Sequence, residues 1–191
     1  MFDEFSKEKS DFLNKKDKSK KGSVDKDVLK LISLINSKKD FYTTSSCAGR
    51  IVLLEVGKKK NECSWILAKH SKVDLKEIKN ALENYKGKNE IWLKQQPLIL
   101  HVACRNLECA KKFLELSRKL FKKAGIIAIT EKKATVEVIG SKHLDTIVKN
   151  KNFLLENKSL KETINSANRN FKRNKKMIED LKNLFKIASF K

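Results

Sequence analysis

A long apolar stripe near the end of the chain constrains the fold more than any other sequence feature. From Leu160 onwards, buried-type side chains recur in alternating steps of four and three residues, and Asn174 fills the one polar position. The stripe consists of Leu160, Ile164, Ala167, Phe171, Asn174, Ile178, Leu181, Phe185 and Ala188. This spacing places them on one face of a single long helix. We expect that basic helix, within residues 158–191, to dock on the core of its own domain; a separate coiled coil is the alternative.

The preceding residues alternate between short apolar runs and amphipathic helices. Apolar runs predict strands over residues 49–56, 63–70, 91–94, 98–104, 126–130 and 135–139, and the first two form a hairpin. Helical spacing predicts helices over residues 74–85 and 107–123, the second closed by Gly125, and another through Val28, Leu31, Ile32 and Ile35 that begins at Ser23 or Asp25.

This mixture predicts an α+β fold over residues 1–157: one domain with a mixed, largely antiparallel sheet flanked by helices. Residues 1–22 are expected to form a basic, partly flexible N-terminal segment. The six glycines are widely separated, so the chain contains no G-x-G-x-x-G nucleotide loop. A Rossmann-type methyltransferase would carry such a loop after its first strand, and this class is excluded.

Residues 41–50, FYTTSSCAGR, have a composition that a core strand does not need. Short hydroxyl side chains beside a glycine leave the backbone approachable, and several donors can converge on one anion or polar ligand. Arg50 adds a planar fork of donors that fits a carboxylate or phosphate, in a chain that otherwise strongly prefers lysine. We interpret the segment as a ligand site; a hydroxyl-rich turn that caps a hairpin is the alternative.

The charge of the chain favours a polyanionic partner. Its 44 basic and 23 acidic residues give a formal charge of +21. Lysine and arginine release condensed counterions when they bind phosphates, so nucleic acid is the favoured partner over purely solubilising lysines or a membrane surface. No apolar run approaches the length of about 20 residues that spans a membrane, and the N-terminus lacks a signal-peptide pattern. We therefore expect a soluble, cytoplasmic protein.

Two blocks of sequence resemble the wybutosine-synthesising tRNA methyltransferase family. Residues 43–51, TTSSCAGRI, are similar to the TSSCSGRI-type signature of that family, and residues 97–105, PLILHVACR, are similar to its P-x-x-x-H-V-x-C-R segment. Weaker similarities follow the family order in residues 17–25, in Trp65 with His70, and in residues 167–168 with Asn174. One departure is Ala48, where the family more often has serine, so no hydroxyl contact is expected at that position.

The resemblance implies methyl transfer from S-adenosylmethionine to N4 of the 4-demethylwyosine-type tricyclic base at position 37 of tRNA-Phe, with lysines on the anticodon arm. Carried over to this chain, it implies catalytic roles for His101, Ser45 and Ser46. It implies cofactor or substrate binding by Thr44, Cys47, Gly49, Arg50, His70, Cys104 and Arg105. If the two blocks lie on neighbouring strands, both are expected to face one cleft.

The cysteines and tryptophans carry weaker signals. The four cysteines, Cys47, Cys63, Cys104 and Cys109, form no C-x-x-C pair, and we predict no metal site. Trp65 is expected in the core, and Trp92, next to lysines, is the better candidate for stacking on a base.

Two further functions are compatible with the sequence. One is a non-catalytic basic RNA-binding module, in which the hydroxyl segment clamps phosphate. The other is a basic scaffold that docks on modification enzymes through its C-terminal helix, in which case deletion of residues 158–191 would spare the folding of the domain.

Overall fold

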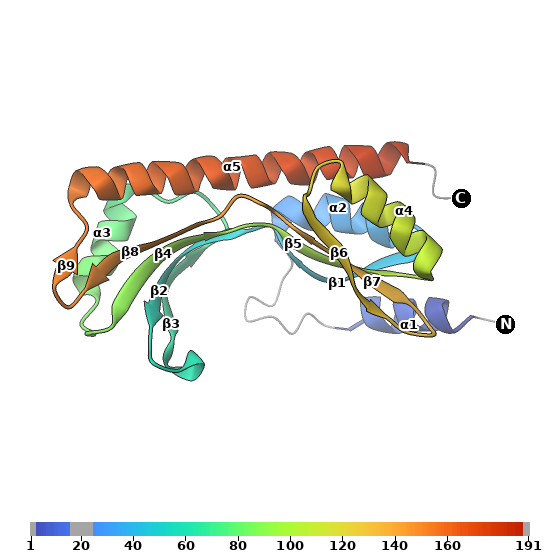
Figure 1. The fold of residues 1–191 in the computed structure, drawn as a ribbon, viewed down its shortest axis with the longest axis horizontal. Coiled ribbons are helices and arrows are strands. Elements are labelled where there is room, and N and C mark those ends of the chain that lie inside the picture. Colours follow the sequence, from blue (N-terminus) through green and yellow to red (C-terminus); the bar gives the residue numbers. More distant parts are fainter. Residues whose placement is uncertain (1–2, 16–24, 189–191) are drawn as a thin grey trace. The chain divides into compact units, whose positions relative to one another are not determined.

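The computed structural model describes residues 3–15 and 25–188 (Figure 1). The fold is α+β, as expected, and its strands form two antiparallel sheets where one sheet was expected. The chain divides into two compact units. Unit 1 contains residues 1–48, 98–141 and 175–191, and unit 2 contains residues 49–97 and 142–174. Most of the lysine-rich N-terminal segment, Ser23 included, lies outside the described residues.

Unit 1 is built on a four-stranded sheet in the order β1-β5-β7-β6. The strands are β1 (Phe41–Cys47), β5 (Ile99–Cys104), β7 (Ala134–Ile139) and β6 (Lys123–Ile129), and every pair is antiparallel. Helices α2 (Lys26–Asn36) and α4 (Leu107–Arg118) and residues 175–187 of the last helix pack on one face of this sheet. The four predicted apolar positions of α2 are all buried, which confirms that helix.

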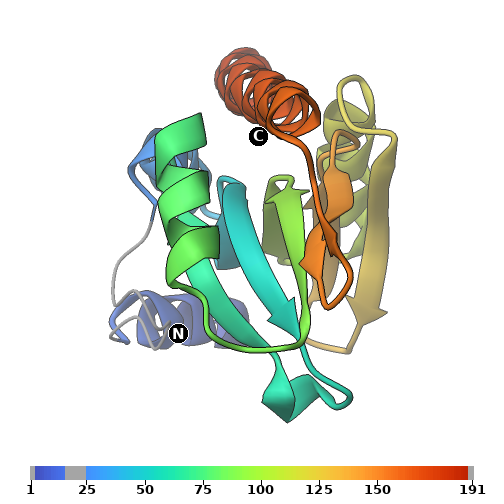
Figure 2. The ribbon, with the colours of Figure 1, turned by 90° about the vertical axis from the view of Figure 1, so that its left-hand side faces the viewer.

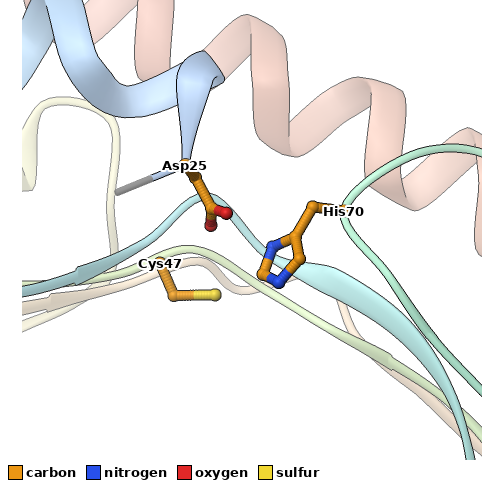
Figure 3. Close-up of side chains that lie close together, drawn as sticks. All are labelled: Asp25, Cys47 and His70. Carbon is orange, nitrogen blue, oxygen red and sulfur yellow. The ribbon is translucent and has the colours of Figure 1, made fainter. Parts of the chain in front are cut away.

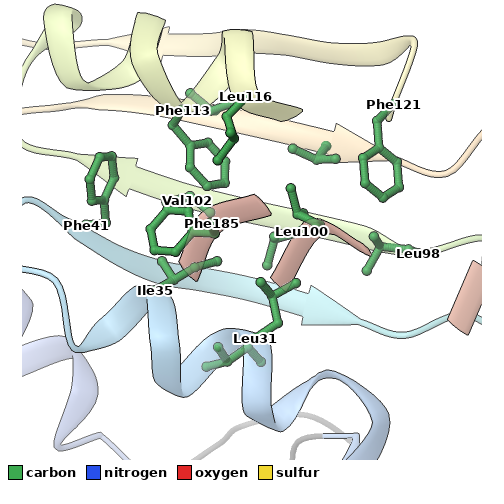
Figure 4. Close-up of a cluster of buried hydrophobic side chains, with 14 of the residues drawn as sticks. Leu31, Ile35, Phe41, Leu98, Leu100, Val102, Phe113, Leu116, Phe121 and Phe185 are labelled. Atoms are coloured by element: carbon green, nitrogen blue, oxygen red, sulfur yellow. The ribbon is translucent and has the colours of Figure 1, made fainter. Parts of the chain in front are cut away.

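Three phenylalanine rings lie at the centre of the unit 1 core (Figure 4). Phe41 of β1, Phe113 of α4 and Phe185 contact one another pairwise, with ring centroids 5.8 to 5.9 Å apart. All three side chains are fully buried. These ring contacts therefore join β1, α4 and the end of the last helix at one point.

Helix α1 (Glu4–Leu13) covers the other face of the unit 1 sheet. Phe5 lies against the Tyr42 ring at a centroid distance of 5.4 Å, and the Tyr42 hydroxyl donates a 3.0 Å hydrogen bond to Glu8. Since residues alternate along a strand, Phe41 faces the main core and Tyr42 faces α1.

Unit 2 is built on a five-stranded antiparallel sheet in the order β3-β2-β4-β8-β9 (Figure 2). Its strands are β3 (Ser64–Lys69), β2 (Arg50–Val56), β4 (Glu90–Gln96), β8 (Leu144–Asn150) and β9 (Phe153–Leu154), and a short 3₁₀ helix, η1 (Lys60–Glu62), lies between β2 and β3. Helix α3 (Leu75–Asn84) and residues 157–174 of the last helix bury one face of the sheet. Asp74 and Glu77 begin α3 with a reciprocal capping box.

The long C-terminal helix, α5 (Asn157–Ile187), confirms the docking prediction. Every stripe position from Leu160 to Phe185 is at most 3 % exposed. Its first part completes the core of unit 2 and its last part completes the core of unit 1. Under the scaffold alternative, deletion of residues 158–191 was expected to spare folding; the deletion would remove buried residues from both cores, so we expect it to impair folding instead.

Several elements differ from the sequence-based expectation. The hydroxyl-rich segment is a strand, β1, because it pairs with β5 along residues 41–47. Helix α4 ends at Arg118, and Gly125 lies inside β6 instead of closing the helix. Strands β8 and β9 were not predicted. Among the described residues, none of the helices combines the length and the apolar character needed to cross a membrane.

Candidate functional site

A row of polar residues crosses the unit 1 sheet. Ser45 of β1 pairs with His101 of β5, His101 pairs with Glu137 of β7, and Glu137 pairs with Gly125 of β6. Directly paired residues of antiparallel strands point to the same face, so the three side chains stand side by side. A Cβ at Gly125 would meet nothing within 4 Å, so this end of the row is open.

His101 and Glu137 form the central pair of this row. His101 Nε2 lies 2.8 Å from Glu137 Oε2, and the two side chains are 25 % and 28 % exposed. A carboxylate on one ring nitrogen fixes the tautomer and the orientation of an imidazole, and leaves the other nitrogen able to accept a proton. Sequence reasoning missed Glu137, because only the pairing of β5 with β7 brings it opposite His101.

The other hydroxyl residues of β1 do not all join this row. The pairing of β1 with β5 shifts register between Thr43 and Ser45, which leaves Thr44 at the irregularity. Ser46 pairs with the core residue Leu100, so it faces away from Ser45 and His101. Ser45 is exposed, and Thr44 and Ser46 are half-buried.

The end of β1 is closed by Asp25, the residue before α2. Asp25 points toward the end of β1, where Cys47 lies (Figure 3). Its Oδ2 accepts a 3.0 Å hydrogen bond from the Ala48 backbone N–H. Ala48 is fully buried in the unit 1 core. Gly49 follows with a φ of 96°, a conformation that favours glycine.

In unit 2, Arg50 begins β2 and lies on the outer face of the sheet. Its Nε donates to the side chain of Gln96, the paired residue on β4, and its guanidinium carbon lies 4.1 Å from the centroid of the Trp65 ring. Within residues 3–15 and 25–188, Arg50 makes no ion pair with a carboxylate. This charge is therefore held in place by neutral partners. His70, directly after β3, is half-buried in the same unit.

Comparison with known proteins supports both the resemblance of the two sequence blocks and the observed fold. The family profile described as Methyltransferase TYW3 matches residues 7–187. The chain belongs to this family. It is 35 % identical over 182 residues to a mouse tRNA wybutosine-synthesizing protein 3 homolog, covering 92 % of this chain and 70 % of that one.

An archaeal relative and a solved structure add to this similarity. The chain is 34 % identical over 169 residues to a Pyrococcus abyssi protein named tRNA(Phe) 7-((3-amino-3-carboxypropyl)-4-demethylwyosine(37)-N(4))-methyltransferase 1, covering 84 % of this chain and 86 % of that one. The PH1069 protein from Pyrococcus horikoshii has a similar structure, with a TM-score of 0.80 at 30 % identity over 86 % of this chain and 87 % of that one. This TYW3-family chain is therefore a methyltransferase.

Two residues of the second TYW3 block have structural surroundings that do not fit a ligand site. Cys104 is fully buried in the unit 1 core, and burial raises the pKa of its thiol well above the usual range. Arg105 forms ion pairs with Asp3, at 2.6 Å, and with Asp40, and it lies over the Phe5 ring. We therefore assign Cys104 to the core and Arg105 to the attachment of α1.

The weaker TYW3 similarity on α5 also has a structural explanation. The Asn168 side chain accepts from the Val73 N–H at 3.1 Å and donates to the Val73 C=O at 2.8 Å, which fixes the loop before α3. Asn174 is fully buried and donates to the Lys142 C=O at 3.5 Å. These two asparagines position loops of unit 2.

The Asp3 ion pair predicts a pH-dependent contribution to stability. Hydrogen bonds from the Ser6 backbone and from Arg105 lower the Asp3 pKa from 3.8 to about 2. A carboxylate with a lowered pKa stabilises the fold above its unfolded pKa, and this contribution is lost as the pH falls. Asp3→Asn, which keeps an N-cap side chain, should unfold at lower denaturant concentration than wild type at neutral pH, and the gap should close between pH 3.8 and about 2.

The control for this measurement is Asp11→Asn on the same helix, whose exposed carboxylate makes no ion pair within the described residues. Its unfolding midpoint should follow that of wild type at every pH. A gap for Asp3→Asn that stays constant down to pH 2 would contradict the assignment.

Proposed function

We propose that this chain transfers a methyl group from S-adenosylmethionine to N4 of a 4-demethylwyosine-type base at position 37 of tRNA-Phe, a step of wybutosine synthesis. The observation that carries the proposal is the His101–Glu137 pair beside the exposed hydroxyl of Ser45. Membership of the TYW3 family and the names of the relatives support the substrate. The proposal includes a cytoplasmic location for the protein.

The proposed reaction requires a proton acceptor. Methylation of N4 forms an N–CH₃ bond, and the proton that N4 carries must leave. With Nε2–H donating to Glu137, His101 has Nδ1 available to take that proton, and the Glu137 carboxylate stabilises the imidazolium that results. Ser45, in the same row, can hold a polar group of the base and so orient it.

The residues present fit the methyl donor. S-adenosylmethionine, when bound, supplies an electrophilic methyl group on a sulfonium and also presents an amino-acid carboxylate. Arg50 offers a guanidinium that Gln96 and Trp65 hold in place and that no carboxylate of the described residues neutralises. Such a fork can bind a carboxylate in a bidentate way. We assign Arg50 to that group, and the half-buried His70 remains a second candidate in this unit.

The tRNA would be bound chiefly by positive charge. The side of α5 away from the stripe exposes Lys158, Lys161, Arg169, Lys172, Arg173 and Lys176, while Lys175 forms a 2.8 Å ion pair with Asp27. Exposed lysines and arginines on one helix can follow a phosphate backbone. We propose that they contact phosphates of the tRNA.

Arg50→Lys should weaken S-adenosylmethionine binding about tenfold, because lysine keeps the charge and loses the planar fork. Isothermal titration calorimetry of the full chain measures this change. The matched control is Arg118→Lys on α4, where the arginine donates to the Ala124 backbone carbonyl and to no other group of the described residues. Equal affinities for wild type and Arg50→Lys would remove Arg50 from the cofactor site.

The experiment that tests the function is transfer of labelled methyl from S-adenosylmethionine to tRNA-Phe that carries the unmethylated tricyclic base. Label in the modified base would support the proposal. Tight binding of that tRNA without label, and without saturable binding of S-adenosylmethionine, would overturn it in favour of the non-catalytic RNA-binding module.

A further inference from the structure

The only two tryptophans of the chain lie in one row across the outer face of the unit 2 sheet. Trp65 of β3 pairs with Leu54 of β2, Leu54 pairs with Trp92 of β4, and Trp92 pairs with Ile147 of β8. Paired residues share a face, so these four side chains form a continuous apolar row. We call this row the tryptophan row. Trp65 is 48 % exposed, so the expectation that it is a core residue was wrong.

The tryptophan row lies opposite the helices of unit 2. Ile91 and Leu93 alternate with Trp92 along β4 and are fully buried in the core that α3 and α5 complete. Side chains alternate between the faces of a strand, so the row points away from those helices. Figure 2 shows both helices on the same side of this sheet.

Both rings are held in fixed positions beside positive charge. The Trp92 indole N–H donates to Glu90 at 3.2 Å, and the Lys94 ammonium lies 5.2 Å from the centroid of the Trp92 ring. Arg50 lies against Trp65. Trp65 is 48 % exposed and Trp92 is half-buried, and an indole ring presents a large, flat apolar surface.

Flat aromatic rings beside cations on an open sheet are typical of proteins that bind single-stranded nucleic acid. Bases stack on the rings and the phosphates follow the cations. The net charge of +21 favours RNA over an apolar peptide as the occupant.

The spacing of the rings favours unpaired nucleotides over a duplex. Neighbouring strands lie about 4.8 Å apart, so Trp65 and Trp92, two strands apart, are separated by roughly 10 Å. Successive bases within a helical strand are only about 3.4 Å apart. The faces of paired bases are also covered by their stacked neighbours in an A-form duplex. The spacing of the two rings therefore fits bases that are not stacked on their neighbours in the RNA.

We propose that the tryptophan row is a stacking platform for unpaired bases of an RNA loop, with Trp92 as its central ring. Under the proposed function, on which this identification of the RNA rests, the occupant is the anticodon loop that carries the target base. The platform binds bases next to the reacting one, and Trp92, unlike Trp65 beside Arg50, has no proposed role in cofactor binding.

Tryptophan fluorescence provides a direct test, because Trp65 and Trp92 are the only tryptophans of the chain. In the Trp65→Phe variant, Trp92 is the only fluorophore. A stem–loop RNA with the anticodon-loop sequence of tRNA-Phe should quench it saturably, since a stacked base quenches an indole. A blunt duplex of the same stem should bind more weakly and leave the fluorescence unchanged. Quenching by the duplex to the same extent would overturn the proposal.

Affinity measurements with Trp92 variants are the second test. Fluorescence anisotropy of labelled stem–loop RNA should show about tenfold weaker binding for Trp92→Ala and near wild-type binding for Trp92→Phe, which keeps a stacking ring. The matched control is Phe153→Ala, an aromatic residue that is 43 % exposed on β9 of the same sheet and outside the row. Calorimetry with S-adenosylmethionine should give the same affinity for Trp92→Ala as for wild type.

The two proposals fail in different ways. Stem–loop affinity that is unchanged in Trp92→Ala, while wild type still transfers methyl to tRNA, would overturn the platform and leave the function. Loss of S-adenosylmethionine affinity in Trp92→Ala without loss of RNA affinity would also overturn the platform, since the row would then bind the cofactor. Stem–loop binding that depends on Trp92 in a protein that transfers no methyl would support the platform and overturn the function.

Discussion

His101→Ala should lower the rate constant of methyl transfer by about 10²- to 10⁴-fold, the range expected for loss of a general base. The fold should persist, because the His101 side chain is 25 % exposed and lies outside the apolar cores. Single-turnover transfer of labelled methyl with saturating tRNA and S-adenosylmethionine isolates this step from binding. The matched control is His143→Ala, since His143 is an exposed loop residue of the same type.

Glu137→Gln distinguishes a base from a purely structural histidine. Glutamine can still accept a hydrogen bond from the imidazole, but it carries no charge that stabilises the imidazolium, so the rate should fall by less than in His101→Ala. A transfer rate in His101→Ala equal to that of wild type would exclude the proposed role. Orientation by other groups, with direct loss of the proton to water, would then be the simpler account.

Phe113→Ala should lower the free energy of unfolding by about 3–5 kcal/mol, the usual cost of removing a buried phenylalanine. Phe113 is fully buried and contacts both Phe41 and Phe185, so the cavity would separate β1, α4 and the end of α5. Chemical denaturation followed by circular dichroism measures the change.

The comparison for Phe113→Ala is Ile129→Ala on β6 of the same unit, where the side chain is 62 % exposed. This variant should stay within about 0.5 kcal/mol of wild type. A loss of less than 1 kcal/mol in Phe113→Ala would mean that the aromatic cluster can rearrange to fill the space.

Local pattern was sufficient to predict helices α2 to α5 and most strands, whereas α1 lies in a segment that was expected to be partly flexible. The spacing of four apolar residues predicted α2, helical spacing over residues 74–85 predicted α3, and the stripe predicted the docked face of α5. Each of these signals lies within a few turns of one helix, where periodicity and capping decide the structure.

Contacts between distant parts of the chain could not be predicted in this way. The hydroxyl-rich β1 has a weak strand pattern of its own, and it is a strand because β5 pairs with it from more than fifty residues away. Glu137 is one of several acidic residues on strands, and only the register of β5 and β7 places it on His101. The burial of Cys104 and the ion pairs of Arg105 depend on the same pairing and on α1.

Four of the ten predicted site residues lie in settings that are compatible with a ligand role, and that role stays a prediction. Ser45 and His101 share a face in unit 1, and Arg50 lies on the outer face of unit 2 with His70 close in sequence to β3. The expectation that both blocks face one cleft stays a prediction. The sequence composition identified the types of residue in the site. The contact partner of each residue could be found only from the fold.

The division of the chain between the two units has a consequence for protein synthesis. The chain passes from one unit to the other after residues 48, 97, 141 and 174, and Leu181 and Phe185 complete a core that begins with α2. A ribosome releases the chain from its N-terminus, so β1 leaves the exit tunnel long before the end of α5 that covers it. Unit 1 therefore cannot reach its native core during translation, and its apolar sheet face remains open until synthesis is complete. Early termination anywhere before Phe185 should yield chains that chaperones retain and proteases remove.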